Sequence, residues 1–199
     1  MISAVVLAAG RSRRMGTQKL LLPVAGQPLI CHVVDQVLAA AVEELIVVTR
    51  TDGRDVTKAL ANRNVRFVTN PNETSEMIDS VRCGLVALPA SCEATLIVLG
   101  DQPGVTTDVV NRLIRTFREQ DRGIVVPTFG GRRGHPLLIA THYRDDIVQR
   151  YDEVGLRGLL QSHPQDVIQV EIPVPGILED VDDPSDYERV VKAASQPPA

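Results

Sequence analysis

The chain has 199 residues, with 21 Lys and Arg against 25 Asp and Glu, and a formal net charge of −4. Its 44% hydrophobic and 23% charged content is ordinary globular composition, too apolar for a disordered chain. The mild acidity and the 3% aromatic content argue against nucleic acid as a partner, because duplexes need a basic surface and single strands need stacking platforms. The length fits one α/β domain.

The apolar N-terminal run, residues 1–9, is far shorter than the roughly 20 residues that span a bilayer, and it lacks the basic flank of a signal peptide. We interpret it as a first strand and expect no membrane association. Cys31, Cys83 and Cys92 show no paired spacing, so neither a disulfide framework nor a zinc site is indicated. These features favour a cytoplasmic protein.

Short β-branched apolar runs alternate with segments of helical periodicity in the first two thirds of the chain. Because the strands lack a polar side, they are expected to be buried on both faces of a mostly parallel central sheet, with helices on both faces. The predicted strands are 5–9, 45–49, 65–68, 94–99 and 123–127, and the predicted helices cover 29–41, 77–88 and 109–117.

The chain changes character after Pro127, where a Gly and Arg loop follows. We expect strands at 136–140 and 167–172, a helix over 151–160, and a last helix with Asp183 as its N-cap and Pro184 at its first position. No linker divides the chain. The prediction is therefore one domain over 1–195, with an N-terminal half (1–127) and a C-terminal half (128–195), and a disordered tail at 196–199.

The sharpest motif is L-A-A-G-R-S-R-R-M-G at residues 7–16, followed by K-L-L-L-P at 19–23. A strand that ends in small residues lets a ligand approach the backbone at the carboxyl edge of the sheet. Loop N–H groups, Arg and Lys can then bind phosphate, which predicts a polyanionic ligand. A basic surface loop with no ligand is the alternative. The motif fits neither the dinucleotide fingerprint nor the P-loop.

Residues 7–19 resemble the signature of the MobA-like NTP transferase family, which includes the molybdenum cofactor cytidylyltransferases and lies in the nucleotide-diphospho-sugar transferase superfamily. The resemblance implies a Rossmann-like nucleotidyltransferase fold, and the Ala8-Ala9-Gly10 form is similar to the cytidylyltransferase branch. It also implies that the first half binds the NTP and the second half binds the acceptor. The implied NTP contacts are Leu7, Ala8, Ala9, Gly10, Ser12, Arg14, Lys19 and Ser80.

L-G-D-Q-P at residues 99–103 and D-V-D-D-P-S-D-Y at residues 180–187 resemble two further family motifs. A carboxylate at a strand end that faces a triphosphate is an oxygen ligand suited to Mg²⁺. The resemblance implies Asp101 and Asp182 as the Mg²⁺ ligands, with Asp180 in support. Asp101 could otherwise be a turn acid ahead of the next helix.

G-H-P at residues 134–136 resembles a family motif in the acceptor half, which implies acceptor contacts from Gly134, His135 and Pro136. A structural role for the histidine is equally compatible with the sequence. The turn after Asn70 departs from the family pattern, and Glu76 and Asp79 are either base contacts or, as we favour, acids in the first turn of a helix. The family motif near residues 152–157 is also altered, and Arg132 and Arg133 could meet an anionic acceptor.

The resemblance implies transfer of CMP from CTP to the terminal phosphate of the molybdenum cofactor, with release of pyrophosphate and with a molybdoenzyme as a possible recipient of the product. Arg14, Lys19 and Asp101 are the implied catalytic residues. A monoester phosphate is largely dianionic at neutral pH, so no general base is needed. The alternatives are a related NTP transferase with another phosphorylated acceptor, a non-catalytic cofactor carrier, and an NAD(P)-dependent oxidoreductase, against which the missing fingerprint argues.

Overall fold

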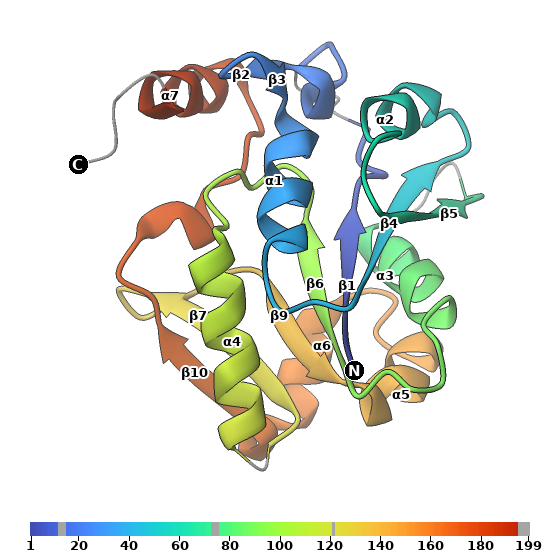
Figure 1. Cartoon of the computed structure of the whole chain (residues 1–199). Helices are drawn as coiled ribbons and strands as arrows, with labels where there is room; N and C mark the ends of the chain where they lie inside the picture. The colour runs from blue at the N-terminus through green and yellow to red at the C-terminus, as the bar shows by residue number, and fades with distance from the viewer. Residues whose placement is uncertain (12–14, 73–75, 121, 195–199) are drawn as a thin grey trace.

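A mixed eight-stranded sheet forms the centre of the computed structural model, with strand order β10-β7-β9-β6-β1-β4-β5 and β8 paired to β7 (Figure 1). The structure describes residues 1–11, 15–72, 76–120 and 122–194. The expected tail at 196–199 therefore lies outside the described residues. The strands are β1 (Ile2–Leu7), β2 (Pro23–Val24), β3 (Gln27–Pro28), β4 (Glu44–Arg50), β5 (Arg66–Asn70), β6 (Ala94–Leu99), β7 (Ile124–Phe129), β8 (Arg132–Arg133), β9 (Leu137–Ala140) and β10 (Val167–Glu171).

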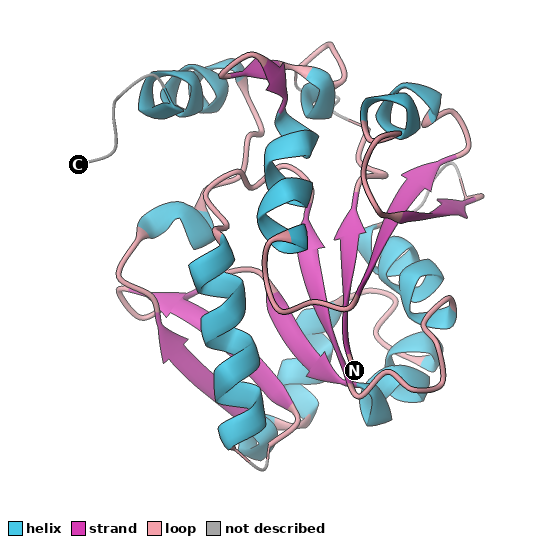
Figure 2. Ribbon diagram, in the orientation of Figure 1, coloured by secondary structure: helices cyan, strands magenta, loops and turns pink. Residues whose placement is uncertain are grey.

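Helices cover both faces of the sheet, as Figure 2 shows, which confirms the predicted single α/β domain. Short 3-10 turns connect several elements, and one of them carries a site residue. The helices are α1 (Leu29–Leu38), α2 (Arg54–Ala59), α3 (Met77–Val86), α4 (Thr107–Glu119), α5 (Arg144–Gln149), α6 (Leu156–Ser162) and α7 (Pro184–Ala194), and the 3-10 turns are η1 (Lys19–Leu21), η2 (Thr141–Tyr143), η3 (Pro164–Asp166) and η4 (Pro175–Leu178).

The core divides into two clusters, one on each face of the sheet. Side chains alternate along a strand, so Ala4 and Val6 of β1 pack in the cluster that includes α1 and α4, while Val5 packs in the cluster that includes α3 and α6. A Cβ on Gly84 of α3 would collide with Val5, so the glycine lets this helix lie close against β1. The central strands are thus buried on both faces, which is why they show no polar alternation.

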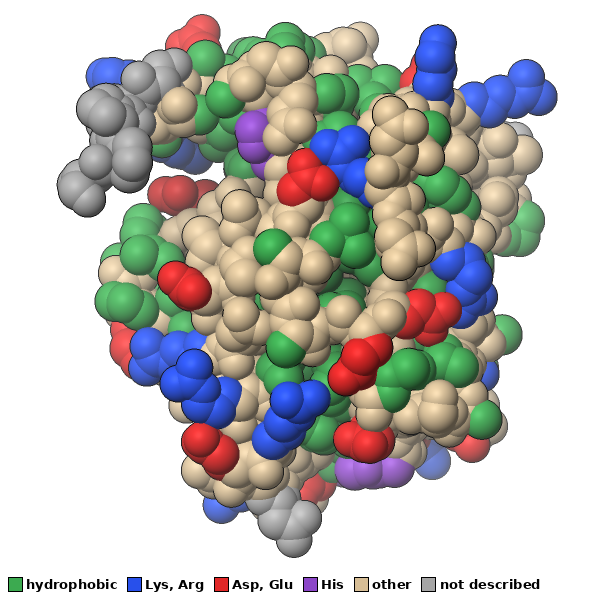
Figure 3. Space-filling view, in the orientation of Figure 1, with side chains coloured by type: hydrophobic (Ala, Val, Ile, Leu, Met, Phe, Trp, Pro, Cys, Tyr) green, Lys and Arg blue, Asp and Glu red, His purple; other side chains and the backbone are tan. Residues whose placement is uncertain are grey.

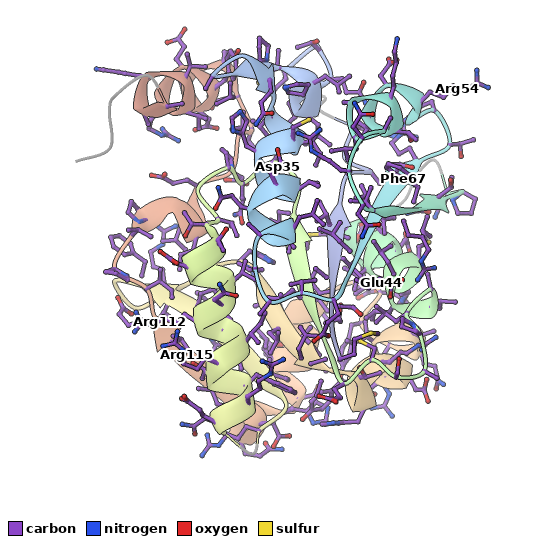
Figure 4. The ribbon with its side chains drawn as sticks, viewed as in Figure 1. Asp35, Glu44, Arg54, Phe67, Arg112 and Arg115 are labelled. Atoms are coloured by element: carbon purple, nitrogen blue, oxygen red, sulfur yellow. The ribbon has the colours of Figure 1, made fainter. Side chains whose placement is uncertain are left out.

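The amphipathic helix α4 shows how the outer layer is built. Thr106 caps its N-terminus by accepting a hydrogen bond from the backbone N–H of Val109, and its apolar side chains face the sheet. Arg112 and Arg115 lie on the outer side, where Figures 3 and 4 show basic side chains over this helix. Among the described helices, none has the length and apolar character to cross a membrane.

The sheet is parallel between β1, β4, β5 and β6 and between β7 and β10, whereas β9 runs antiparallel to both β6 and β7. The stretch from β7 through β8 to β9 has no helix, and a parallel return would need a crossover of a dozen residues or more. The expected helix over 151–160 begins only at Leu156, because Tyr151 and Gly155 have positive φ angles of 72° and 59°. The sequence did not predict α2, α5 or the β2–β3 hairpin.

Candidate active site at the carboxyl edge of the sheet

The carboxyl ends of β1 and β6 lie side by side at the upper edge of the sheet in Figure 1, with Leu7 opposite Leu99. The backbone N–H of Gly100 donates to the carbonyl oxygen of Leu7 at 3.0 Å. A Cβ on Gly100 would lie 2.8 Å from that oxygen, so glycine is needed for this close approach. The two predicted motifs at residues 7–16 and 99–103 therefore meet at one edge.

Lys19, Asp101 and Asp182 form the central cluster of this edge. Lys19 Nζ lies 2.5 Å from Asp101 Oδ2 and 2.8 Å from Asp182 Oδ1. The Lys19 side chain is only 10% exposed, whereas the carboxylates are 20% and 35% exposed. The structure thus brings together three residues proposed from the sequence, and the ammonium group lies between the two carboxylates.

Backbone contacts fix the C-terminal part of this cluster. The N–H of Val181 donates to the carbonyl oxygen of Asp101 at 3.0 Å. Asp183 accepts hydrogen bonds from Ser185 N at 2.8 Å and Asp186 N at 3.0 Å, which confirms it as the cap of α7. Tyr187 of the same helix donates to the carbonyl oxygen of Pro23 at 2.6 Å, so α7 is tied to the β2–β3 hairpin.

The charges in the cluster shift two pKa values. Burial alone would lower the pKa of Lys19, but the charge of Asp101 and the hydrogen bonds to Asp101 and Asp182 outweigh it and raise the pKa. Burial raises the pKa of Asp180, and the charges of Asp182 and Asp101 add to this shift. Lys19 therefore remains protonated, and Asp180 belongs to the same electrostatic environment as the two proposed metal ligands.

The G-H-P motif lies next to this cluster. β9 pairs antiparallel with β6, and the N–H of His135 just before β9 donates to the carbonyl oxygen of Ile177 at 2.9 Å. Burial lowers the pKa of His135, opposed by a backbone contact with Ile97 and by the charge of Asp101. Its Nδ1 is buried and has no hydrogen-bond partner among the described residues. The imidazole is therefore neutral and lies within electrostatic reach of Asp101.

Two adjoining cavities open along the same edge. One, of about 510 Å³, is lined by Ala8, Gly10 and residues 16–18, so two of the expected NTP contacts face it. The other, of about 420 Å³, is lined by Asn70 and Asn72. Arg50 and Asp52 contribute to both cavities and form an ion pair at 2.9 Å.

Residues at the ends of β4 and β5 are part of this edge although the sequence reasoning did not assign them to it. The polar residues that directly follow a buried strand are the signal that could have found Arg50 and Asn70. Arg54, which also lines the 420 Å³ cavity, lies at the outer side of α2 (Figure 4).

The expected contact Ser80 lies behind the smaller cavity. It is 4% exposed and accepts a hydrogen bond from Asn70 Nδ2 at 2.9 Å, so it supports a residue of the cavity wall. Asp79 Oδ2 accepts from the backbone N–H of Glu76 at 3.1 Å at the start of α3. This bond is typical of a capping box and agrees with the helix-acid interpretation of these residues.

Several expected site residues are placed elsewhere or lie outside the description. Ser12 and Arg14 fall in residues 12–14, outside the described part of the chain. Arg132 and Arg133 form the exposed strand β8, which pairs with β7. Within the described residues, no three His, Cys, Asp or Glu side chains converge to hold a metal ion by themselves.

The profile of the MobA-like NTP transferase domain matches residues 4–167, most of the chain. The chain belongs to this family. As a MobA-like NTP transferase it is a nucleotidyltransferase. The motif at the end of β1 and the acidic cluster lie along one edge of its sheet. This membership confirms the family and enzyme class expected from the sequence.

Three similar proteins extend this finding. The molybdenum cofactor cytidylyltransferase of Escherichia coli (strain K12) is 27% identical over 187 residues, covering 94% of this chain and 93% of that protein. A nucleotidyl transferase from Methanothermobacter thermautotroptrophicus is 30% identical with a TM-score of 0.85, covering 98% and 97% of the two chains. Rv0371c from Mycobacterium tuberculosis H37Rv is 26% identical with a TM-score of 0.86, covering 96% and 97%.

Rv0371c has also been solved as a complex with manganese. That structure has a TM-score of 0.80 and 25% identity, and the match covers 96% of this chain and 98% of the other. A divalent metal is therefore found with a relative of this MobA-like NTP transferase.

Proposed function

We propose that this MobA-like NTP transferase transfers CMP from CTP to the terminal phosphate of the molybdenum cofactor in the cytoplasm and releases pyrophosphate. The observation that carries the proposal is the convergence of Lys19, Asp101 and Asp182 beside the cavity lined by Ala8 and Gly10. The similarity to the Escherichia coli cytidylyltransferase over 94% of the chain supports the choice of donor and acceptor.

The NTP is assigned to the two cavities. Backbone N–H groups after β1, with Ser12 and Arg14, would bind the triphosphate near the 510 Å³ cavity. The base would reach the 420 Å³ cavity, where Arg50 offers donors and Asp52 offers acceptors. An amino group together with a carbonyl oxygen, as in cytosine and in guanine, matches this mixture of donors and acceptors, so the choice of cytosine rests on the similarity to the Escherichia coli cytidylyltransferase.

The donor set at Asp101 and Asp182 fits a divalent cation such as Mg²⁺. Two carboxylate oxygens already converge on one positive group, the ammonium of Lys19, and Mg²⁺ is typically bound by one or two carboxylates together with substrate phosphates. A cation bound there would draw electron density from the phosphate oxygens and neutralise charge that develops during transfer.

The protein residues act by positioning and charge. An oxygen of the acceptor monoester attacks the α-phosphorus of the NTP, the new P–O bond forms, and the bond to the β-phosphate oxygen breaks to release pyrophosphate. Arg14 is proposed to stabilise the transition state and Lys19 to bind the triphosphate. Because the attacking phosphate is already largely dianionic at neutral pH, no side chain has to remove a proton.

The acceptor is assigned to the second half of the chain, residues 128–195. In the sheet, β9 and β1 lie on opposite sides of β6, which ends just before Asp101. Because the G-H-P motif at residues 134–136 directly precedes β9, an acceptor phosphate bound there would approach the NTP across the end of β6. The imidazole of His135 is partly exposed, and its exposed part would meet a polar group of the acceptor. A molybdoenzyme is the proposed recipient of the product.

Product analysis tests this assignment. The protein is incubated with CTP, Mg²⁺ and isolated molybdenum cofactor, and the cofactor is analysed by mass spectrometry. We expect a covalent cofactor–CMP product that is absent when CTP is replaced by CMP. A product with a different phosphorylated acceptor, and none with the molybdenum cofactor, would favour the related-transferase alternative.

A further inference from the structure

We propose that Lys19 is an internal cation that closes the metal site of the nucleotide-free protein, and that the NTP opens the site by drawing Lys19 to its triphosphate. The proposal rests on the proposed function, because it takes Asp101 and Asp182 as metal ligands and Lys19 as a triphosphate contact. It adds that Lys19 cannot bridge the two carboxylates and contact the triphosphate at the same time, so that metal binding and nucleotide binding are coupled through one side chain.

The first observation is the position of the ammonium group. Lys19 Nζ lies 2.5 Å from Asp101 Oδ2 and 2.8 Å from Asp182 Oδ1, which is between the oxygens that a divalent cation would use. A metal bonded to both oxygens at about 2.0–2.1 Å would lie against the ammonium, where two like charges repel. The metal and the bridging ammonium therefore cannot occupy this position together.

The second observation is that the arrangement is held in place. Lys19 lies in the 3-10 turn η1, and its side chain is 10% exposed, so the charge is stabilised mainly by its bonds to the carboxylates and less by water. The backbone bond from Val181 to Asp101 keeps the two acidic segments together.

The third observation is a cavity next to Lys19 that can hold a triphosphate. Residues 16–18, directly before Lys19 in the chain, line the 510 Å³ cavity together with Gly10 and Arg11. Gln18, the residue before Lys19, lines this cavity. A triphosphate bound there would place several negative charges near Lys19 and offer its ammonium group a new partner. By thermodynamic linkage, a nucleotide that draws Lys19 away from Asp101 and Asp182 strengthens metal binding, and the metal strengthens nucleotide binding by the same factor.

Metal binding without nucleotide is the decisive measurement, since free NTP chelates metals by itself. Mn²⁺ affinity is measured by electron paramagnetic resonance for the wild type, Lys19→Met and Arg50→Met. Arg50 is the matched control because it is a cation at the same edge, paired with Asp52 at 2.9 Å. We expect Lys19→Met to bind Mn²⁺ about 5- to 150-fold more tightly than the wild type, the usual range of coupling between sites, and Arg50→Met to stay near the wild type.

A second measurement needs no variant. The chain has three lysines, so protein labelled with ¹³C at lysine Cε gives three side-chain signals, and the exposed Lys58 and Lys192 serve as internal references. We expect Mg²⁺ together with a non-hydrolysable CTP analogue to shift the Lys19 signal and leave the two references unchanged. This readout decides the matter if Lys19→Met does not fold.

The outcomes separate this inference from the proposed function. If metal and CTP analogue both bind while Lys19→Met binds Mn²⁺ no more tightly than the wild type, or the Lys19 signal stays in place, Lys19 does not gate the metal and the inference is wrong. If Arg50→Met tightens Mn²⁺ binding as much as Lys19→Met, the effect is general electrostatics and the inference is again wrong. If neither metal nor nucleotide binds at all, the proposed function itself fails.

Discussion

The backbone N–H of Val181 donates to the carbonyl oxygen of Asp101 at 3.0 Å, and this bond joins the end of β6 to the C-terminal segment. It places the Asp182 carboxylate beside the Asp101 carboxylate, although 81 positions separate the two residues in the chain. The C-terminal motif therefore places a carboxylate at the same sheet edge as the end of the first strand, in addition to capping α7 through Asp183.

Both carboxylates should be required for catalysis. Asp101→Asn should lower kcat by at least about 10²-fold, the scale of losing one preorganised electrostatic element, and Asp182→Asn should act in the same direction. Steady-state pyrophosphate release at saturating CTP measures this. Asp183→Asn keeps a capping side chain at the start of α7 and serves as the neighbouring control. Turnover close to the wild type in both ligand variants would remove the metal assignment.

The two cations of the signature should differ in their kinetic effects. Arg14→Ala should lower kcat more than it raises KM, because Arg14 is assigned to charge that develops in the transition state. Lys19→Ala should change both parameters, since Lys19 is assigned to the ground-state triphosphate. Full kcat and KM determination for CTP checks both assignments. An effect of Arg14→Ala on KM alone would mean that the roles are wrong.

Gly134 should be intolerant of a larger side chain. A Cβ at this position would collide with the backbone carbonyl oxygen of Ile177, which also accepts the His135 hydrogen bond. Gly134→Ala should cost about 1–3 kcal/mol of unfolding free energy, as overpacking usually does, and lower the Tm by at least about 2 °C. Gly10→Ala is the control, because its added Cβ meets no atom within 4 Å. Equal melting temperatures for the two variants would contradict this packing argument.

Asp146 should stabilise the C-terminal half of the chain when its carboxyl group is ionised. The hydrogen bond from Tyr151, together with contacts from His163 and Arg150, lowers the pKa of Asp146 below its usual 3.8. A carboxylate with a lowered pKa in the folded state adds stability above the unfolded pKa and loses it as the pH falls through the folded pKa. We expect Asp146→Asn to lower the Tm at pH 7 and to match the wild type more closely near pH 3. A Tm difference that does not change with pH would argue against this charge effect.

The sequence predicted the parts of the fold that depend on local pattern. The run at 94–99 was recognised with the bounds of β6, and Asp183 caps α7 as expected. The β2–β3 hairpin was missed because two-residue strands carry too few side chains to show a period. The antiparallel β9 has the same apolar pattern as a parallel strand, so its direction follows only from the short connection to β7.

The candidate site was predictable only in part, because some of its residues come together only through the tertiary structure. Asp101 and Asp182 were found through their motifs, but no pattern in the chain indicates that Lys19 lies between them. Arg50 and Asn70 were not assigned to the site because each belongs to a strand end without a motif of its own. Their contribution depends on how neighbouring strands align at the sheet edge, which is a tertiary property.

A substitution at the end of β1 should change the base preference of the enzyme. Ala9 belongs to the part of the signature that resembles cytidylyltransferases, and Ala9→Gly imitates the guanylyltransferase form. One unpaired polar group in a base pocket is worth roughly 1–3 kcal/mol, about one or two decades of discrimination. We expect Ala9→Gly to reduce the preference for CTP over GTP, measured as the ratio of kcat/KM values. An unchanged ratio would mean that Ala9 adds nothing to the base selection made in the cavity lined by Arg50 and Asp52.

The most direct test of the central claim is kcat/KM for pyrophosphate release with each of the four NTPs, in the presence of isolated molybdenum cofactor and Mg²⁺. The account predicts that CTP gives the highest value, and that release depends on the cofactor and is lost in Asp101→Asn. Pyrophosphate release that favours a purine nucleotide, or that does not depend on the cofactor, would contradict the assignment of this protein as a molybdenum cofactor cytidylyltransferase.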